Sequence, residues 1–385
     1  MKRIITLTAA LFISAAVFAQ AGDNAPKEVK AWSGKAYAVH QESYTPSFDI
    51  DGKNTKVRNV ILMIGDGMGM GAVNAAMYAN GGTLTMTNLR TFGLVRTQSA
   101  DNFTTDSAAS GTAYATGEKT NNGYVGMNTK QEKIANLPEK LAPLGYACGV
   151  VSTDDLNGAT PASFFAHQSA RGSTAAIWTD LTDCYLSFAS AGTRKVYETL
   201  ELKTRTEIEK QFKVVYDPAQ AGDAKRLIYL PESVNADRGD YLPRTTKMAI
   251  DFLSSCSKKG FFLMVEGARI DKEEHRNDYN GVVRETLDFD KAIEEAIRFA
   301  EKDGHTLVII SADHETGGTV LNFGVPSEGM VMGTFTSRGH SPMMVPLFAY
   351  GPKSGMFMGT QENSDVSNKI YTILSGKNSA FCGLP

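Results

Sequence analysis

The most regular feature of the chain is a series of short apolar runs, each bounded by glycine, proline or charged residues. These runs are apolar at consecutive positions rather than at alternate ones, which is typical of strands buried on both faces of a parallel sheet. The six runs are NVILMIGDG (59–67), ACGVVSTD (147–154), KRLIYLP (225–231), GFFLMVEG (260–267), HTLVIISADH (305–314) and VPLFAYG (345–351).

Helix-like segments separate several of the runs, the clearest of them from Val282 to Glu301. This alternation predicts an α/β fold with a largely parallel central sheet and helices on both faces. We find neither an internal repeat nor an evident linker, so residues 57–385 are expected to form one domain. Residues 20–56 are polar and weakly periodic, and we interpret them as an N-terminal lead-in segment.

The first 19 residues have the pattern of an export signal. Lys2 and Arg3 precede an apolar run from Ile4 to Phe18, and the run ends in a plausible cleavage site after Ala19. The run is too short for a confident membrane span, and we find no second apolar stretch of spanning length. We therefore expect a periplasmic or secreted protein without a membrane span after signal removal.

The net charge bears on nucleic-acid binding, and the cysteine spacing bears on metal binding and disulfides. The net charge is -3 at pH 7, whereas nucleic-acid-binding domains usually carry a strongly basic face, so we expect no nucleic-acid partner. The four cysteines, Cys148, Cys184, Cys256 and Cys382, lack the CxxC spacing of a metal site. An oxidising compartment permits disulfides, but the sequence does not choose among the possible pairings.

Ionisable residues follow four of the predicted strands. Asp66 follows NVILMIG, Asp154 follows ACGVVST, Glu266 follows FFLMV, and Asp313 and His314 follow LVIISA. A single residue of this kind would ordinarily be a cap or a solvated turn. Open α/β sheets bind ligands at the carboxyl ends of their strands, so four such ends predict a site there.

Further residues of metal-ligand type accompany these strand ends. Asp271 and His275 stand four apart in GARIDKEEH, on one face if the segment is helical. His340 stands in SRGHSP before the last predicted strand, and glycines flank Asp66 and allow close approach. Imidazoles and carboxylates without thiolates are typical of catalytic zinc sites with an open position.

Ser107 is the candidate nucleophile. It follows Asp106 in TTDSAASGTAYATG, where a helix of small residues is predicted to begin and its first backbone amides would favour an anion. A serine in this position is also commonly a helix cap, and the spacing alone leaves both interpretations open. A serine hydroxyl needs activation, and no histidine stands next to Ser107 in the sequence to act as its base. A bound metal ion would activate the hydroxyl by lowering its pKa.

Taken together, these segments resemble the alkaline phosphatase family. The matching stretches are VILMIGDGMG, TTDSAASGTAYATG, VSTDDLNGATPASFFAHQSAR, FFLMVEGARIDKEEH, VIISADHETGG and the GH before MMVPLFAYGP; they cover roughly Val57 to Pro352. The resemblance implies a bacterial type of metal-dependent phosphomonoesterase with a serine nucleophile. It further implies small phosphorylated substrates, a phosphoserine intermediate and a possible homodimer.

By position, the resemblance implies a site for two zinc ions and one magnesium ion. One zinc would be held by Asp271, His275 and His340; the second by Asp66, Asp313 and His314, with Ser107 bound; and the magnesium by Asp66, Thr160 and Glu266. An all-oxygen set is what magnesium prefers. Arg171 would bind two phosphoryl oxygens, and Lys272 would reach phosphate through water.

One position departs from the better-known bacterial pattern. The family has an acid two residues before the threonine ligand, in the outer shell of the magnesium, and here Gly158 stands there. We therefore expect the third metal to be held more weakly, unless Asp154 or Asp155 compensates. His167 is interpreted as a structural or outer-shell residue rather than as a ligand.

Two other functions are alternatives. A phosphodiesterase or phosphonate hydrolase of the same superfamily is the nearer one, and the clamp expected of Arg171 favours monoesters over it. A non-catalytic phosphate-binding or zinc-binding protein is the other. The combination of nucleophile, metal ligands and arginine favours an enzyme.

Overall fold

The computed structural model describes residues 32–37 and 40–377 of the 385-residue chain. The predicted signal peptide and Cys382 lie outside the described residues. All six apolar runs contain strands of one ten-stranded sheet, so the predicted buried sheet is confirmed. In spatial order its strands are β15 (Gly359–Glu362), β3 (Thr91–Arg96), β14 (Val345–Tyr350), β9 (Thr306–Ser311), β2 (Asn59–Gly65), β8 (Phe261–Gly267), β4 (Ala147–Ser152), β5 (Phe188–Ser190), β7 (Leu227–Tyr229) and β6 (Lys213–Val215).

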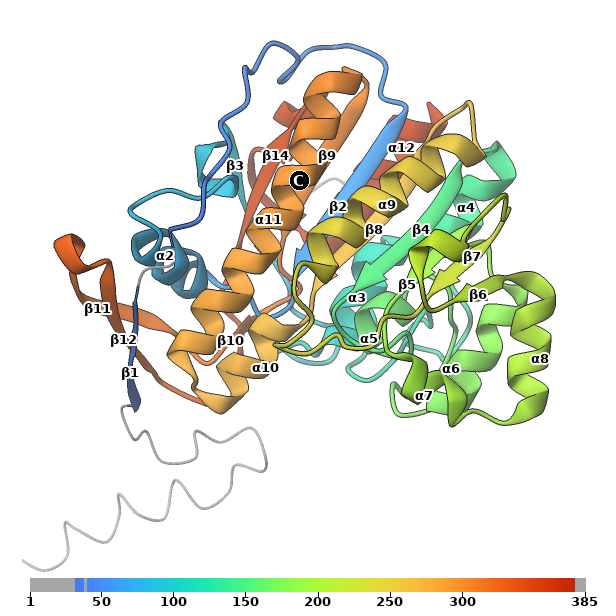
Figure 1. Ribbon diagram of the computed structural model, residues 1–385, viewed down its shortest axis with the longest axis horizontal. Helices are drawn as coiled ribbons and strands as arrows, with labels where there is room; N and C mark the ends of the chain where they lie inside the picture. Colours follow the sequence, from blue (N-terminus) through green and yellow to red (C-terminus); the bar gives the residue numbers. More distant parts are fainter. Residues whose placement is uncertain (1–31, 38–39, 378–385) are drawn as a thin grey trace, which may run out of the picture.

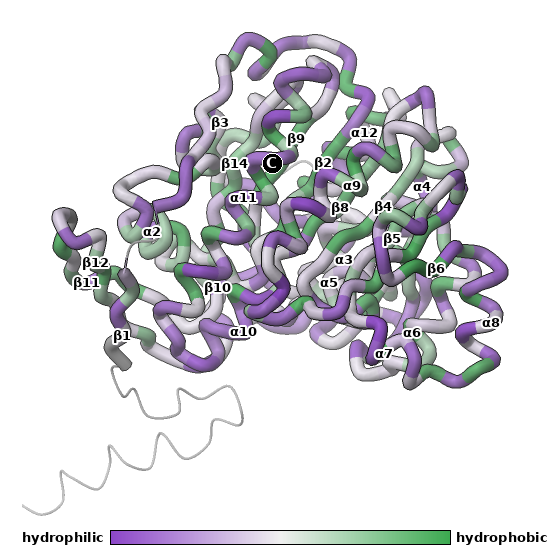
Figure 2. The backbone as a smooth tube through the Cα atoms, in the orientation of Figure 1, coloured by the Kyte–Doolittle hydropathy of each residue, from purple (hydrophilic) through white to green (hydrophobic). Residues whose placement is uncertain are grey.

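The sheet is parallel except around one strand. β14 runs antiparallel to both β3 and β9, and the other adjacent pairs are parallel. β2, β4, β8 and β9 are buried at every residue, because helices cover both faces of the sheet. In Figure 2 these strands form the hydrophobic centre of the molecule.

Helices cover both faces of the sheet (Figure 1). The long helices α9 (Tyr241–Cys256) and α11 (Tyr279–Asp303) pack on one face, where α11 contains the helix predicted from Val282 to Glu301. The other face is covered by α3 (Ser107–Thr116), α4 (Leu137–Leu141), α5 (Ala159–Ala162) and α12 (Asn363–Ser375). The remaining α-helices of the described residues are α2 (Met70–Ala79), α6 (Thr174–Asp180), α7 (Arg194–Glu198), α8 (Leu202–Gln211) and α10 (Arg269–Arg276).

Two small sheets stand beside the main one. β1 (Trp32–Ala36), β12 (Met330–Phe335) and β11 (Val320–Val325) form an antiparallel sheet, which places part of the lead-in segment against a hairpin from the end of the chain. β10 (Glu315–Thr316) pairs with β13 (His340–Ser341). The chain is thus one α/β domain built on a large, mostly parallel sheet.

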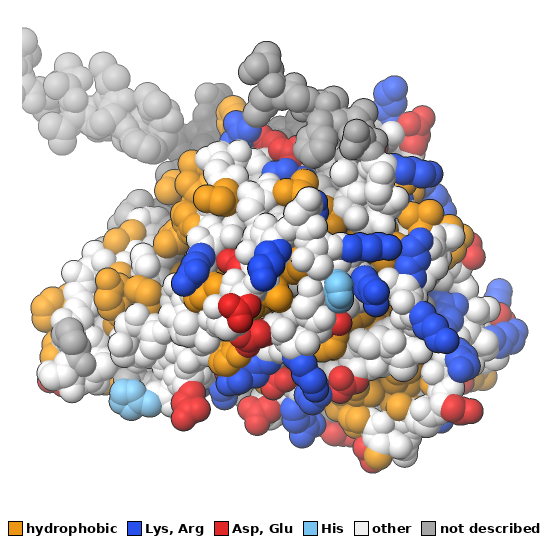
Figure 3. All heavy atoms as spheres, turned by 90° about the horizontal axis from the view of Figure 1, so that it is seen from above, with side chains coloured by type: hydrophobic (Ala, Val, Ile, Leu, Met, Phe, Trp, Pro, Cys, Tyr) orange, Lys and Arg blue, Asp and Glu red, His pale blue; other side chains and the backbone are white. Residues whose placement is uncertain are grey.

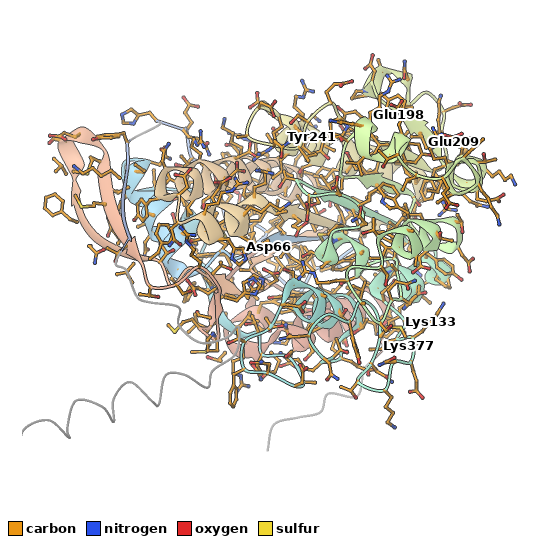
Figure 4. All side chains as sticks on the ribbon, turned by 90° about the horizontal axis from the view of Figure 1, so that it is seen from below. Asp66, Lys133, Glu198, Glu209, Tyr241 and Lys377 are labelled. Atoms are coloured by element: carbon orange, nitrogen blue, oxygen red, sulfur yellow. The ribbon has the colours of Figure 1, made fainter. Side chains whose placement is uncertain are left out.

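The two ends of the parallel strands lie on opposite sides of the molecule. In the view from above, lysine and arginine side chains lie interspersed with acidic ones (Figure 3). The carboxyl ends of the strands lie on the opposite side, where Asp66 is near the centre of the view from below (Figure 4).

Within the described ranges, we find no helix with the length and apolarity needed to cross a membrane.

Candidate active site

The carboxyl ends of the central strands bring the predicted acids to one edge. Ile64 of β2 pairs with Glu266 of β8 on one side and with Ser311 of β9 on the other. Asp66 and Asp313 each stand two residues beyond those pairs. Since the three strands are parallel and in register, their terminal side chains meet around one point.

Asp66, Asp313 and His314 form the first group of converging ligand atoms, and all three residues are buried. His314 Nε2 lies 3.1 Å from Asp313 Oδ2 and 3.5 Å from Asp66 Oδ1. The other Asp313 oxygen, Oδ1, accepts from the Gly67 and His314 amides at 3.1 and 2.9 Å. Asp66 Oδ1 and Asp313 Oδ2 are buried without a hydrogen-bond partner among the described residues, which is costly unless a cation binds them.

Asp271, His275 and His340 form the second group. Asp271 and His275 are one turn apart on α10, as predicted, and His275 Nε2 lies 3.3 Å from Asp271 Oδ2. His340 Nε2 lies 3.5 Å from Asp271 Oδ1 and 3.3 Å from His275 Nε2. The Nδ1 atoms face backbone carbonyls, Arg338 for His275 and Thr105 for His340, so both Nε2 atoms are free to bind an ion.

A short strand pair brings His340 to this position. β13 pairs with β10 so that His340 is opposite Thr316, two residues beyond His314. The His314 and His340 rings stack with their centroids 3.6 Å apart. Thr316 Oγ1 donates to Asp271 Oδ1 at 2.6 Å and lies 3.1 Å from His314 Nδ1, so it links the two groups.

Close packing of these groups shifts their pKa values. Burial raises the pKa of Asp66 well above its ordinary value, and the charges of Asp313 and Asp271 raise it further. Burial, and then the nearby charge of His314, lower the pKa of His340 to about 4. Burial acts to raise the pKa of Asp271, but the hydrogen bond with His275 and the neighbouring imidazoles hold it below its usual range. His340 is therefore neutral at neutral pH, with a lone pair available to a cation.

Ser107 is the first residue of α3, and its hydroxyl lies 3.2 Å from His314 Nε2. The helix is capped by Asp106, whose Oδ1 accepts from the Ala109 amide at 2.9 Å, so the alternative in which Ser107 is the cap is wrong. Asp106 Oδ2 accepts from Arg171 Nη1 at 3.2 Å, which holds the guanidinium beside the serine. The carboxylate that caps the helix of the nucleophile candidate thus also binds the arginine.

A third set of oxygen atoms lies beside the first group. Thr160 Oγ1 on α5 is buried and lies close to the Glu266 carboxyl, without a hydrogen bond of ordinary geometry. Burial, and then the charge of Asp154, raise the pKa of Glu266 to about 8. Ser152 Oγ donates to Glu266 Oε2. Together with Asp66, these side chains offer hard oxygen ligands of the kind that magnesium takes.

The structure also places the remaining candidates. Lys272 on α10 pairs with Asp154 at the end of β4. His167 lies outside both groups, with Nδ1 2.7 Å from the Gly126 carbonyl and Nε2 2.9 Å from Glu139 Oε1. Both of its ring nitrogens therefore have partners in the surrounding fold. Cys148, Cys184 and Cys256 are free thiols in the structure.

Sequence reasoning missed two residues that organise the site. Asp106 was considered only as the neighbour of Ser107, although an acid at a predicted helix start is a signal for a cap. Thr316, in ADHETGG, was not considered, and a hydroxyl next to a ligand pair carries little signal on its own. Gly67 has a φ of +75°, and a Cβ there would lie 2.8 Å from the Asp271 Cα, so only glycine allows α10 to approach.

Comparison with known proteins gives consistent matches. The sequence profile of the family described as alkaline phosphatase matches residues 57–199 and 230–334. Alkaline phosphatase 4 of Bacillus subtilis is 31% identical, over 83% of this chain and 89% of the relative. Alkaline phosphatase of Escherichia coli is 29% identical, over 82% and 85%.

A solved structure agrees with these matches. The alkaline phosphatase from the Antarctic bacterium TAB5 has a TM-score of 0.77 and 33% identity, over 85% of this chain and 99% of the other. A variant of the TAB5 enzyme was solved with Mg bound in its M3 site.

Proposed function

The chain belongs to the alkaline phosphatase family, and on this premise we propose that it hydrolyses phosphate monoesters through a phosphoserine intermediate on Ser107. The products are an alcohol and inorganic phosphate. The observation that carries this proposal is the position of the Ser107 hydroxyl, 3.2 Å from His314 Nε2 of a buried ligand group and next to the Asp106–Arg171 pair.

The donor atoms fit two zinc ions and one magnesium ion. Zinc would be held by Asp271, His275 and His340 in one group and by Asp66, Asp313 and His314 in the other, and magnesium by Asp66, Thr160 and Glu266. The buried, unpartnered oxygens of Asp66, Asp313 and Thr160 support this fit. When bound, such ions lower the pKa of hydroxyl groups and water and neutralise phosphoryl charge.

Ser107 acts in two steps. Its Oγ forms a bond to phosphorus as the bond from phosphorus to the ester oxygen breaks, and the alcohol leaves with a proton that replaces the one lost by the serine hydroxyl. Water then attacks the phosphoserine, the bond from phosphorus to Oγ breaks, and Ser107 regains its proton as phosphate departs. Ser107 is the first residue of α3, a ten-residue helix, and the amino end of such a helix favours an anionic group.

Arg171 orients the phosphoryl group. Asp106 holds its guanidinium from one side, and the planar fork can donate two hydrogen bonds to phosphoryl oxygens. A monoester dianion has more charge and more free oxygens for this contact than a diester monoanion. The clamp therefore supports monoesters as the substrate class, and Lys272, which lies next to Asp271 on α10, would bind phosphate through water.

The test compares a monoester and a diester that release the same leaving group. Purified protein should release p-nitrophenol from p-nitrophenyl phosphate much faster than from the bis(p-nitrophenyl) diester. A chelator should abolish the reaction, and zinc should restore it. Faster turnover of the diester would transfer the assignment to a phosphodiesterase, and turnover of neither ester would favour a binding protein.

Export forms part of the proposal. The signal sequence predicted for residues 1–19 would deliver the enzyme to the periplasm or the medium. Cell fractionation with N-terminal sequencing of the mature protein tests this, and Gln20 is the expected first residue.

A further inference from the structure

Asp154 is fixed by the fold at the rim of the active site. It lies two residues beyond β4, its amide donates to Ser152 Oγ at 2.8 Å, and its carbonyl accepts from the Gly192 amide at 2.6 Å. Its carboxylate oxygen Oδ1 forms an ion pair with Lys272 Nζ. The Asp154 side chain is 30% exposed and the Lys272 side chain is 35% exposed. The backbone contacts fix the main chain at Asp154, and the ion pair with Lys272 holds its carboxylate.

Gly158 leaves room for this carboxylate. A Cβ built at position 158 would lie 2.7 Å from Asp154 Oδ2 and 2.8 Å from the Asp155 carbonyl oxygen. Its φ is −56°, which any residue adopts, so space rather than conformation requires glycine here. The Asp154 carboxylate therefore occupies the space that a side chain at position 158 would need.

The segment that carries this carboxylate is also linked to the third oxygen set. Ser152 Oγ accepts from the Asp154 amide and donates to Glu266 Oε2. Gly158, whose side-chain space the Asp154 carboxylate occupies, is the residue before α5, which carries the buried Thr160 hydroxyl. Asp154 is thus paired with Lys272 through its side chain and lies next to the segments that carry Glu266 and Thr160.

Asp155 has a different environment. Its carbonyl accepts from the Gly158 amide at 2.8 Å, and a Cβ at Gly192 would lie 2.8 Å from its Oδ1. Its carboxylate therefore faces the Gly192 turn, and the ion pair with Lys272 belongs to Asp154.

We propose that Asp154 is the positioning residue of this site: it fixes the Lys272 ammonium and supplies the outer carboxylate for a magnesium ion at Asp66, Thr160 and Glu266. Because Gly158 has no side chain, the Asp154 carboxylate can occupy the space beside it. The inference rests on the proposed function. It also reverses the expectation that Gly158 leaves the third metal weakly held.

Magnesium affinity is the first readout. Isothermal titration of zinc-loaded protein with MgCl₂ should give a dissociation constant about 10- to 100-fold higher for Asp154→Asn than for the wild type, as for other outer-shell carboxylates. The matched control, Asp155→Asn, should bind magnesium like the wild type.

Inhibition by inorganic phosphate is the second readout. Asp154→Asn should change the inhibition constant several-fold in the wild-type background and have no further effect in Lys272→Met, because the residue acts through the lysine. Melting temperatures of the zinc-loaded variants show whether each is folded, and Asp154→Ser, which also lacks the carboxylate, replaces Asp154→Asn if that variant is not.

The outcomes separate the two proposals. Wild-type protein that neither binds magnesium nor hydrolyses the monoester would overturn the proposed function. A wild type that does both, with Asp154→Asn binding magnesium equally well, would overturn the role of Asp154 alone. Equal effects of Asp154→Asn in the two lysine backgrounds would overturn its action through Lys272.

Discussion

Replacing Arg171 by alanine should slow monoester hydrolysis more than diester hydrolysis. In the structure, Nη1 donates to Asp106 Oδ2 at 3.2 Å, and we find no other hydrogen-bond partner for the guanidinium among the described residues. The remaining nitrogens are available to two phosphoryl oxygens. The side chain is 44% exposed, so part of its charge is screened by solvent.

The expected magnitude follows from hydrogen bonds to a charged group. Such bonds contribute about 1.5–3 kcal/mol, and the exposure of Arg171 limits the total to this range rather than to twice it. The loss in kcat/KM for a monoester should therefore be roughly 10- to 150-fold. A diester monoanion has less charge at the oxygens that face the clamp, so its loss should be smaller.

Steady-state rates on p-nitrophenyl phosphate and on the bis(p-nitrophenyl) diester measure both effects in one protein preparation. Arg194→Ala is the matched control, because Arg194 is similarly exposed and pairs with Glu198, which lies far from Asp66 in Figure 4. The control should keep both rates. Equal losses on the two esters in Arg171→Ala, or no loss on the monoester, would refute the assignment of Arg171 to monoester binding.

Three further predictions test other parts of the site. Ser107→Ala should keep its zinc content and melting temperature but lose most turnover and all phosphate incorporation during the reaction; a normal amount of phosphoenzyme would require another nucleophile. In metal-free protein, Glu266 has its pKa raised to about 8, so this group binds its proton more tightly in the folded state than in the unfolded state. Urea unfolding should therefore show the wild type losing stability relative to Glu266→Gln as the pH rises from about 4.5 to about 8. A stability difference between the two proteins that does not change with pH would contradict this. In Cys382→Ser protein, Ellman's reagent should modify one thiol, exposed Cys256, before unfolding, because the other two thiols are buried and their pKa values are raised; modification of more thiols in the folded protein would be the opposite result.

Much of the fold and the location of the site could be predicted from the sequence, because the patterns that indicate them are local. The strands around Ile64 and Ile309 contain runs of consecutive apolar residues and are buried at every position, as a sheet covered on both faces requires. The helical spacing of Asp271 and His275 likewise needs nothing beyond the chain between them. Parallel strands then place the acids that follow them on one edge, so the location of the site followed from the strand pattern.

The role of each residue within the site depends on the tertiary structure. Whether Ser107 or Asp106 caps α3 is decided by the backbone geometry at that helix start, which the residue types leave open. His340 reaches the other ligands because β13 pairs with β10 in one register, and pairing register over two residues leaves no sequence signal.

The position of Asp154 shows the limit most directly. The sequence identified a missing acid at Gly158 and two candidate replacements, but it could not choose between neighbouring residues whose side chains point in different directions. The choice depends on which carboxylate the loop after β4 turns towards Lys272, and that is set by contacts with Ser152 and Gly192. Periodicity and residue type record what each segment needs locally, whereas the space left between segments exists only once they have packed together.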